Sequence, residues 1–202
     1  MAKVVETKTR AYRPSRNSTI VGTAIEVFGE LGSDATLEAV ASRAEMSTAA
    51  IFYHFDTKED LMAAAVQECA ALVNLRVQQL WATNPNATSR EIMRGLWEWA
   101  DMYPAHARLL YVWAVSGPRA VQDVRQEFVN WYIKHTTRYF PGQPSGAVDR
   151  AFRDLSSRTY MTFSMYCAEA WNAGWGVYGT TDKERLLDEM ARLRMHVLQL
   201  ER

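Results

Sequence analysis

The segment from Ser47 to Phe55 reads STAAIFYHF and combines small, hydroxyl-bearing and aromatic side chains in one short run. Small residues at the start of a helix let its backbone approach base edges and phosphates closely. Tyr53 and His54 can hydrogen-bond a sugar-phosphate backbone or a base, whereas Ile51 and Phe55 are four apart and share an apolar face. This pattern predicts a helix that contacts DNA, and the expected contacts are Ser47, Thr48, Ala49, Ala50, Tyr53 and His54, followed by Lys58 on the next helix.

Catalytic and metal-binding patterns are missing from the sequence. Its four histidines have no ligand-like spacing, and Cys69 and Cys167 lie far apart in apolar surroundings, which predicts two buried free thiols. An enzyme that uses Cys167 or His135 is the alternative, but no third partner and no glycine-rich anion loop accompany them. We therefore expect a protein that is not an enzyme and has no metal and no cofactor.

Charge is distributed unevenly along a chain that has 23 basic and 23 acidic residues. Residues 1–17 carry five basic side chains against one acidic side chain, which gives plus four and predicts a flexible basic arm. Residues 18–61 carry two basic against eight acidic side chains, which gives minus six. A polyanion is attracted by the first segment and repelled by the second. Arg13 and Arg16 of the arm are therefore expected to contact phosphates or the minor groove.

The apolar periodicity of the chain is helical throughout and predicts an all-α protein with about nine helices. Gly32 is expected to end the first helix, Thr36 and Ser47 to cap the second and third, and Thr57 and Asp182 to cap a long fourth helix and the last one. Three short helices with a tight turn between the second and third form a helix-turn-helix unit. No signal peptide and no run of eighteen apolar residues is present, so we expect a cytoplasmic protein outside the membrane.

Residues 18–65 resemble the DNA-binding domain of the TetR family of transcriptional regulators. The matching positions are Ala24, Phe28, Gly32, Thr36, Ala41, Ala44, Ser47, Ile51, Tyr53, His54, Phe55, Lys58, Glu59 and Leu61. The resemblance implies a homodimer that binds a palindromic operator and leaves it when a small ligand enters the larger domain. It also adds Thr36 to the expected DNA contacts. We divide the chain into the arm 1–17, a helix-turn-helix domain 18–61, and a ligand-binding and dimerisation domain 62–202.

Three positions depart from the family pattern. Glu45 stands where glycine is common, and a left-handed backbone there would cost about 1–2 kcal/mol. Ala49 replaces another glycine. Phe52, which can join the small core, replaces a tyrosine whose hydroxyl contacts phosphate in the family. The acidic domain and Glu45 keep an alternative function open, a small-molecule-binding protein or scaffold with weakened or lost DNA binding.

Aromatic residues are concentrated after residue 80 and predict a ring-lined cavity for a flat or apolar ligand. Core packing is the alternative for each ring taken singly, and His135 fits a hydrogen-bonded core histidine as well as a ligand contact. The expected ligand-binding residues are Trp99, Tyr103, Trp113, Trp131, His135, Tyr160, Phe163 and Cys167.

The last two helices carry apolar stripes at steps of three and four residues. These stripes can pack inside one subunit, or they can pair two subunits in a four-helix bundle, which the family resemblance favours. The expected dimer interface consists of Phe152, Leu155, Thr159, Leu186, Met190, Leu193 and Val197. Together these predictions indicate a ligand-responsive regulator, most simply a repressor that an apolar or aromatic effector releases from double-stranded operator DNA.

Overall fold

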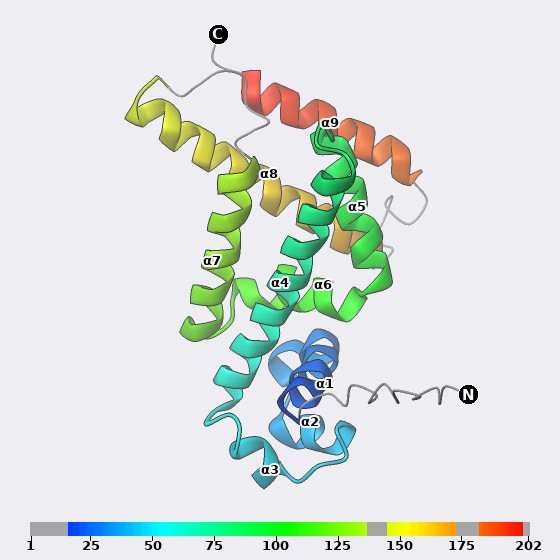
Figure 1. The fold of residues 1–202 in the computed structure, drawn as a ribbon, viewed down its shortest axis with the longest axis vertical. Helices are drawn as coiled ribbons and strands as arrows, with labels where there is room; N and C mark the ends of the chain where they lie inside the picture. Colours follow the sequence, from blue (N-terminus) through cyan, green and yellow to red (C-terminus); the bar gives the residue numbers. More distant parts are fainter. Residues whose placement is uncertain (1–15, 137–144, 173–181, 200–202) are drawn as a thin grey trace, which may run out of the picture.

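The computed structural model describes residues 16–136, 145–172 and 182–199, and every regular element in these ranges is helical (Figure 1). The predicted all-α class and the predicted number of helices are confirmed, since nine α-helices and two short 3-10 helices occur there. In chain order they are α1 (Arg16–Leu31), η1 (Gly32–Asp34), α2 (Leu37–Arg43), α3 (Thr48–Phe52), α4 (Lys58–Thr83), α5 (Ser89–Met102), α6 (Pro104–Tyr111), η2 (Trp113–Val115), α7 (Arg119–Thr136), α8 (Ala147–Asn172) and α9 (Lys183–Gln199).

Helix α4 connects the two ends of the molecule. It contains 26 residues, which at 1.5 Å per residue gives a length of about 39 Å. Figure 1 shows α1, α2 and α3 gathered at the first end of α4, and α5, α8 and α9 beside its other end. Side chains that are fully buried, such as Phe28, Leu61 and Leu109, form one core that extends from α1 through α4 and α6.

The predicted helix starts are confirmed by side chains that accept hydrogen bonds from backbone amides three residues later. Each cap satisfies an amide that has no partner inside the first turn of its helix. The predicted caps are Thr36 (3.2 Å), Ser47 (3.2 Å), Thr57 (3.0 Å) and Asp182 (2.8 Å), and Thr88 caps α5 in the same way (3.3 Å). Helix α1 begins at Arg16, two residues before the predicted start, so Arg16 is helical, whereas Arg13 lies outside the described residues.

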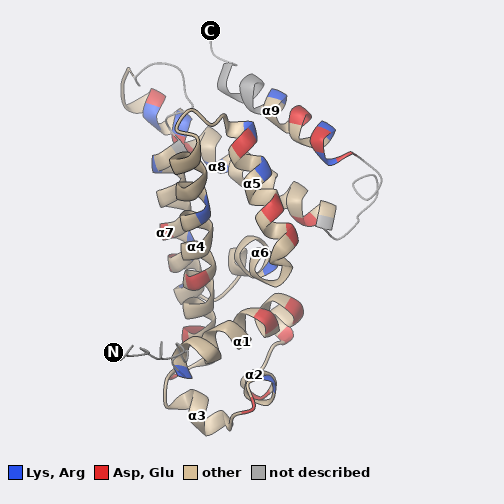
Figure 2. Cartoon of the chain, turned by 45° about the vertical axis from the view of Figure 1, so that its right-hand side comes forward, with Lys and Arg blue, Asp and Glu red and all other residues tan. Residues whose placement is uncertain are grey.

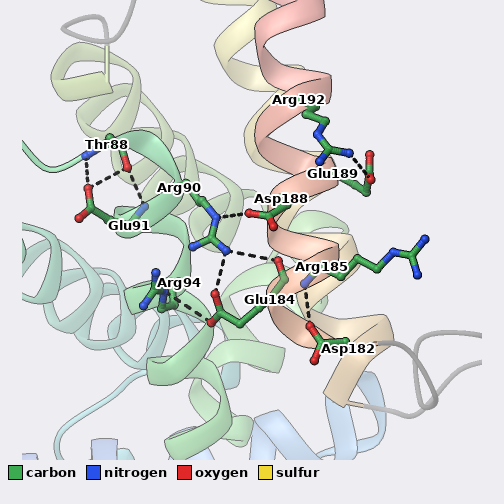
Figure 3. Close-up of polar contacts among 10 residues, drawn as sticks. All are labelled: Thr88, Arg90, Glu91, Arg94, Asp182, Glu184, Arg185, Asp188, Glu189 and Arg192. Carbon is green, nitrogen blue, oxygen red and sulfur yellow. Dashed lines mark hydrogen bonds and ion pairs between the residues drawn. The ribbon is translucent and has the colours of Figure 1, made fainter.

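A second apolar cluster joins α5, α8 and α9 and includes Trp97, Tyr160, Cys167 and Met190. Ion pairs reinforce this junction (Figure 3). The guanidinium of Arg90 on α5 contacts Asp188 at 2.5 Å and Glu184 at 2.8 Å on α9. Helix α9 is therefore held against its own subunit by both apolar packing and charge.

Both cysteines are buried and free, as predicted. Burial raises the pKa of the Cys69 thiol, which therefore stays protonated in the core. None of the helices in the three described ranges has the length and apolar character required to cross a bilayer. In the same ranges no three His, Cys, Asp or Glu side chains come together as metal ligands would.

Candidate DNA-contacting face and ligand cavity

Helices α2 and α3 are joined by a tight turn whose central residue is Glu45. Its backbone has a φ of 55°, and it is the non-glycine residue with positive φ in the part of the chain that the structure describes. The left-handed backbone lets the amide of Met46 reach back to the carbonyl oxygen of Ala41 at 2.9 Å. The turn therefore has the conformation for which glycine is usual, and the side chain of Glu45 adds strain to it.

The aromatic run of α3 divides by direction. Ile51 is fully buried, and Phe55 is half-buried against the same core. Tyr53 is 87% exposed, and its ring meets that of His54 edge to face with centroids 5.2 Å apart. Phe52 is half-exposed, so the prediction that it can join the core is wrong. A short helix with one buried anchor thus presents two rings and its first turn outward.

Thr36 precedes α2 and Lys58 is the first residue of α4, and both side chains already have partners. The ammonium of Lys58 donates to the carbonyl oxygen of Ala35 at 3.2 Å, and the hydroxyl of Thr36 caps α2. The Ser47 hydroxyl likewise accepts from the amide of Ala50. These interactions hold Lys58, Thr36 and Ser47 in fixed positions around α2 and α3.

Few basic residues lie around α3 (Figure 2). Arg43 of α2 forms an ion pair with Glu30 of α1 at 2.7 Å, and both side chains are about half exposed. Of the two basic residues in residues 18–61, Arg43 is thus paired with Glu30, and Lys58 donates to the carbonyl oxygen of Ala35.

A family model described as "Bacterial regulatory proteins, tetR family" matches residues 20–65, which run from α1 into the first turns of α4. The helix-turn-helix segment of this chain matches the TetR family. A comparison with curated protein sequences gives no match.

Solved structures of similar fold cover most of the chain. A TetR-like transcriptional regulator from Rhodococcus sp. RHA1 aligns with a TM-score of 0.66 and 18% identity, over 94% of this chain and 96% of that one. The fatty acid degradation regulator FadR from Bacillus halodurans aligns with a TM-score of 0.67 and 14% identity, over 95% of this chain and 98% of that one. The multidrug binding protein EbrR, complexed with imidazole, aligns with a TM-score of 0.65 and 20% identity, over 92% of this chain and 96% of that one. At these identities the likeness establishes the fold.

Helices α1 and α6 approach each other very closely where the helix-turn-helix unit meets the larger helical body. A Cβ atom on Gly29 would lie 2.4 Å from the carbonyl oxygen of Ala105, and one on Gly32 would lie 2.6 Å from the ring of Trp113. The indole nitrogen of Trp113 donates to the carbonyl oxygen of Gly29 at 3.2 Å. Trp113, which we expected in the ligand cavity, is therefore a packing residue of this joint.

A polar group also lies at the joint. The Nδ1 atom of His106 on α6 is 3.5 Å from a carboxylate oxygen of Glu26 on α1, and its ring lies against Trp99 and Tyr103. Burial lowers the pKa of His106, and the nearby charges of Glu26 and Glu68 oppose this shift. Because the desolvation effect is the larger one, the neutral imidazole is the favoured form in the fold.

The residues predicted to bind a ligand are not brought together. Trp99 and Tyr103 surround His106 near the joint, and Trp131 stacks on His135 with ring centroids 4.1 Å apart, beside Trp81. His135 also makes the predicted core hydrogen bond, with its Nδ1 atom 2.7 Å from the carbonyl oxygen of Trp131. The remaining three lie on α8, where Tyr160 and Cys167 are buried in the second cluster and Phe163 faces outward.

A cavity of about 20 Å³ lies between α5, α6, α7 and α8. None of the eight predicted residues lines it. Sequence reasoning favoured rings with polar tips and missed the methionines, although Met161, Met165 and Ala168 recur at helical spacing on one face of α8. The lining residues are Met93, Leu96, Trp97, Tyr111, Tyr132, Met161, Ser164, Met165 and Ala168.

One face of α8 is apolar and exposed. Val148 is 84% exposed, Leu155 62% and Tyr166 56%, and Phe163 with Thr159 borders an open groove on the same helix. The predicted interface residues of α9 differ from these. Met190 is buried and Leu186 half-buried within their own subunit, Leu193 is 42% exposed, and the side chain of Val197 lies outside the described residues. Phe152 on α8 is half-buried.

Proposed function

We propose that this TetR-family chain is a transcriptional regulator that binds operator DNA as a homodimer and is released by a small apolar effector. The observation that carries the proposal is the exposure of Tyr53 on a five-residue helix whose neighbour Ile51 is fully buried. A soluble protein that leaves such a ring in solvent, next to a capped first turn, presents a surface suited to the major groove.

Dimerisation is supported by the exposed apolar face of α8. Contiguous apolar side chains on a surface mark an interaction site, and Val148, Leu155 and Tyr166 all project from one helix. Two copies would also place two recognition helices on successive major grooves, roughly 34 Å apart, as a palindromic operator requires. We include α8, with Leu193 of α9, in the proposed interface. Leu155→Arg is expected to shift the chain from dimer to monomer in sedimentation, and an unchanged dimer would exclude this face.

The basic arm is proposed to supply the electrostatic attraction to DNA that the acidic helix-turn-helix unit does not supply. Arg16 begins α1, and the arm before it carries Arg13 and three further basic residues. A chain that lacks residues 1–15 is expected to bind DNA more weakly and with a flatter dependence on salt, because fewer counterions are released. An unchanged salt slope would show that the arm does not contact DNA.

Coupling between effector and DNA is proposed to run through α6. Tyr111, the last residue of α6, lines the cavity, and α6 packs on α1 through Ala105 and Gly29. A ligand that enlarges the cavity would therefore displace α6 against the helix-turn-helix unit. Release of DNA requires that the ligand bind the DNA-incompetent arrangement more tightly. The related EbrR structures hold imidazole and malachite green in that protein.

The deciding experiment is a mobility shift with DNA from beside the chain's own gene, using the full chain and the variant Tyr53→Ala. The wild type is expected to bind specifically, and the variant is expected to lose at least about tenfold in affinity. Equal binding of both proteins would contradict the proposed use of α3. A bacterial regulator of this kind acts in the cytoplasm, where the chromosome lies.

A second function is favoured by the charge of the helix-turn-helix unit. Its eight acidic side chains against two basic ones, with Arg43 paired to Glu30, suit a ligand-binding protein that no longer binds DNA. That function predicts ligand binding without any specific shift on DNA from beside the gene, whereas the first predicts both.

A further inference from the structure

The cavity between α5 and α8 restricts the chemistry of the molecule that can occupy it. We propose that the effector is a compact, uncharged, largely apolar molecule with one hydrogen-bond acceptor, which accepts from the indole N–H of Trp97. This inference names the ligand class of the proposed ligand-responsive function and therefore rests on that function. It is carried by the lining of the cavity and by an unpartnered donor on one of the lining residues.

The lining is soft and apolar. Three methionines, Met93, Met161 and Met165, contribute to it from α5 and α8. The present volume of about 20 Å³ has room for about one water molecule, so a larger occupant must displace side chains. Methionine side chains have several rotatable bonds and polarisable sulfurs, so they can move aside at low cost and still contact a ring or an alkyl group.

No side chain in the lining carries a charge at neutral pH. The most acidic side chains of the lining are the phenols of Tyr111 and Tyr132. Burial raises the pKa of Tyr111 further, so its hydroxyl stays protonated. Glu169 follows Ala168 on α8 but is paired with Arg108 at 3.1 Å. A charged ligand would therefore lose its hydration without gaining a counter-charge, which excludes carboxylates and ammonium compounds as tight occupants.

Trp97, one of the lining residues, carries an unsatisfied polar group. The Nε1 atom of Trp97 is buried and has no hydrogen-bond partner within the described ranges, although only 2% of the residue is exposed. Buried donors are normally paired, so an unpaired one indicates a missing partner. The hydroxyl of Ser164 already donates to the carbonyl oxygen of Tyr160 at 2.7 Å, so it is not available to donate to a ligand.

A matched set of small probes tests the ligand class on the full chain without DNA. Acetophenone has a carbonyl acceptor, cumene has a similar shape without one, and phenylacetate and benzylammonium carry opposite charges. Titration calorimetry is expected to show acetophenone binding about tenfold more tightly than cumene, since one buried hydrogen bond distinguishes them. Neither charged probe is expected to bind. Tighter binding of a charged probe, or equal binding of acetophenone and cumene, would overturn the inference.

Two tryptophan variants assign the donor. Trp97→Phe keeps an aromatic ring but removes the N–H, so the preference for acetophenone over cumene should disappear. Trp99→Phe, on the same helix but outside the lining, is the control and should keep the preference. A preserved preference in Trp97→Phe would refute the assignment to Trp97, and the wild-type ratio tests the ligand class whether or not either variant folds.

The proposed function and this inference fail separately. If acetophenone binds as expected but leaves a protein–DNA complex intact in the mobility shift, the ligand class stands and ligand-controlled release does not. If DNA is bound specifically but the probe preferences are absent, the regulator stands and the ligand class is wrong.

Discussion

Tyr53 and Trp97 are aromatic residues in two separate regions of the molecule, and each is unusual in the opposite way. Tyr53 is 87% exposed although a ring gains from burial, and Trp97 is 2% exposed although its N–H has no partner in the described structure. Burial of apolar area and pairing of buried polar groups are the two main requirements of a stable fold. A residue that fails one of them indicates a binding surface, for DNA at Tyr53 and for a small acceptor at Trp97.

The helix-turn-helix region offers the strongest test of this contrast, because a stability residue and a surface residue lie two positions apart. Ile51→Ala removes a fully buried side chain and is expected to lower the free energy of unfolding by about 2–5 kcal/mol. Tyr53→Ala is expected to change it by no more than about 0.5 kcal/mol. Denaturant unfolding at equal protein concentration measures both, and similar losses for the two variants would show that Tyr53 is a structural residue.

The two regions can communicate only if α1 and α6 remain in contact, and the Gly29 joint tests that requirement. Gly29→Ala forces a methyl group against the backbone of Ala105 and is expected to cost about 1–3 kcal/mol of stability. Gly22→Ala, also on α1, meets nothing within 4 Å and is expected to gain up to about 1 kcal/mol from helix propensity. Thermal unfolding compares them, and equal midpoints for the two variants would contradict the close approach.

Local features of both regions could be predicted from the sequence, and distant contacts could not. A cap such as Thr36 or Asp182 depends on an amide three residues away, so its role follows from neighbouring residues. Trp113 instead bonds to Gly29, 84 positions earlier in the chain. Its partner is set by how α6 crosses α1, and no periodicity within either helix reveals that crossing.

The cavity was missed for a related reason. An aromatic residue on a long helix can face the core, a neighbouring helix or a void, and the choice depends on residues from several helices. Trp131 and His135 stack on each other along α7, whereas Trp97 on α5 reaches the cavity. On α3 the buried side was predicted at Ile51, because a five-residue helix has one buried side, whereas the adjacent Phe52 was wrongly expected to share it.

The joint between the regions should respond to pH through His106. Burial lowers the pKa of this imidazole in the fold, so the unfolded chain takes up the proton first as the pH falls below about 6.5. The free energy of unfolding is therefore expected to decrease between about pH 7 and pH 5, and His106→Gln should flatten that decrease. Denaturation curves across this range measure the difference, and parallel curves for the two proteins would show that His106 does not contribute.

Substitutions of Glu45 are expected to have the smallest effects on stability and DNA affinity. They distinguish the contribution of backbone strain from that of charge in the DNA-contacting region. Glu45→Gly relieves a left-handed backbone and is expected to raise stability by about 1 kcal/mol. It also removes a carboxylate near α3, so DNA affinity should rise modestly at low salt. Glu45→Gln keeps the strain and removes only the charge, so it should raise affinity without raising stability. If Glu45→Gln leaves DNA affinity unchanged while Glu45→Gly stabilises the fold, the turn carboxylate lies away from the phosphates, and α3 must enter the groove at an angle that turns Glu45 outward.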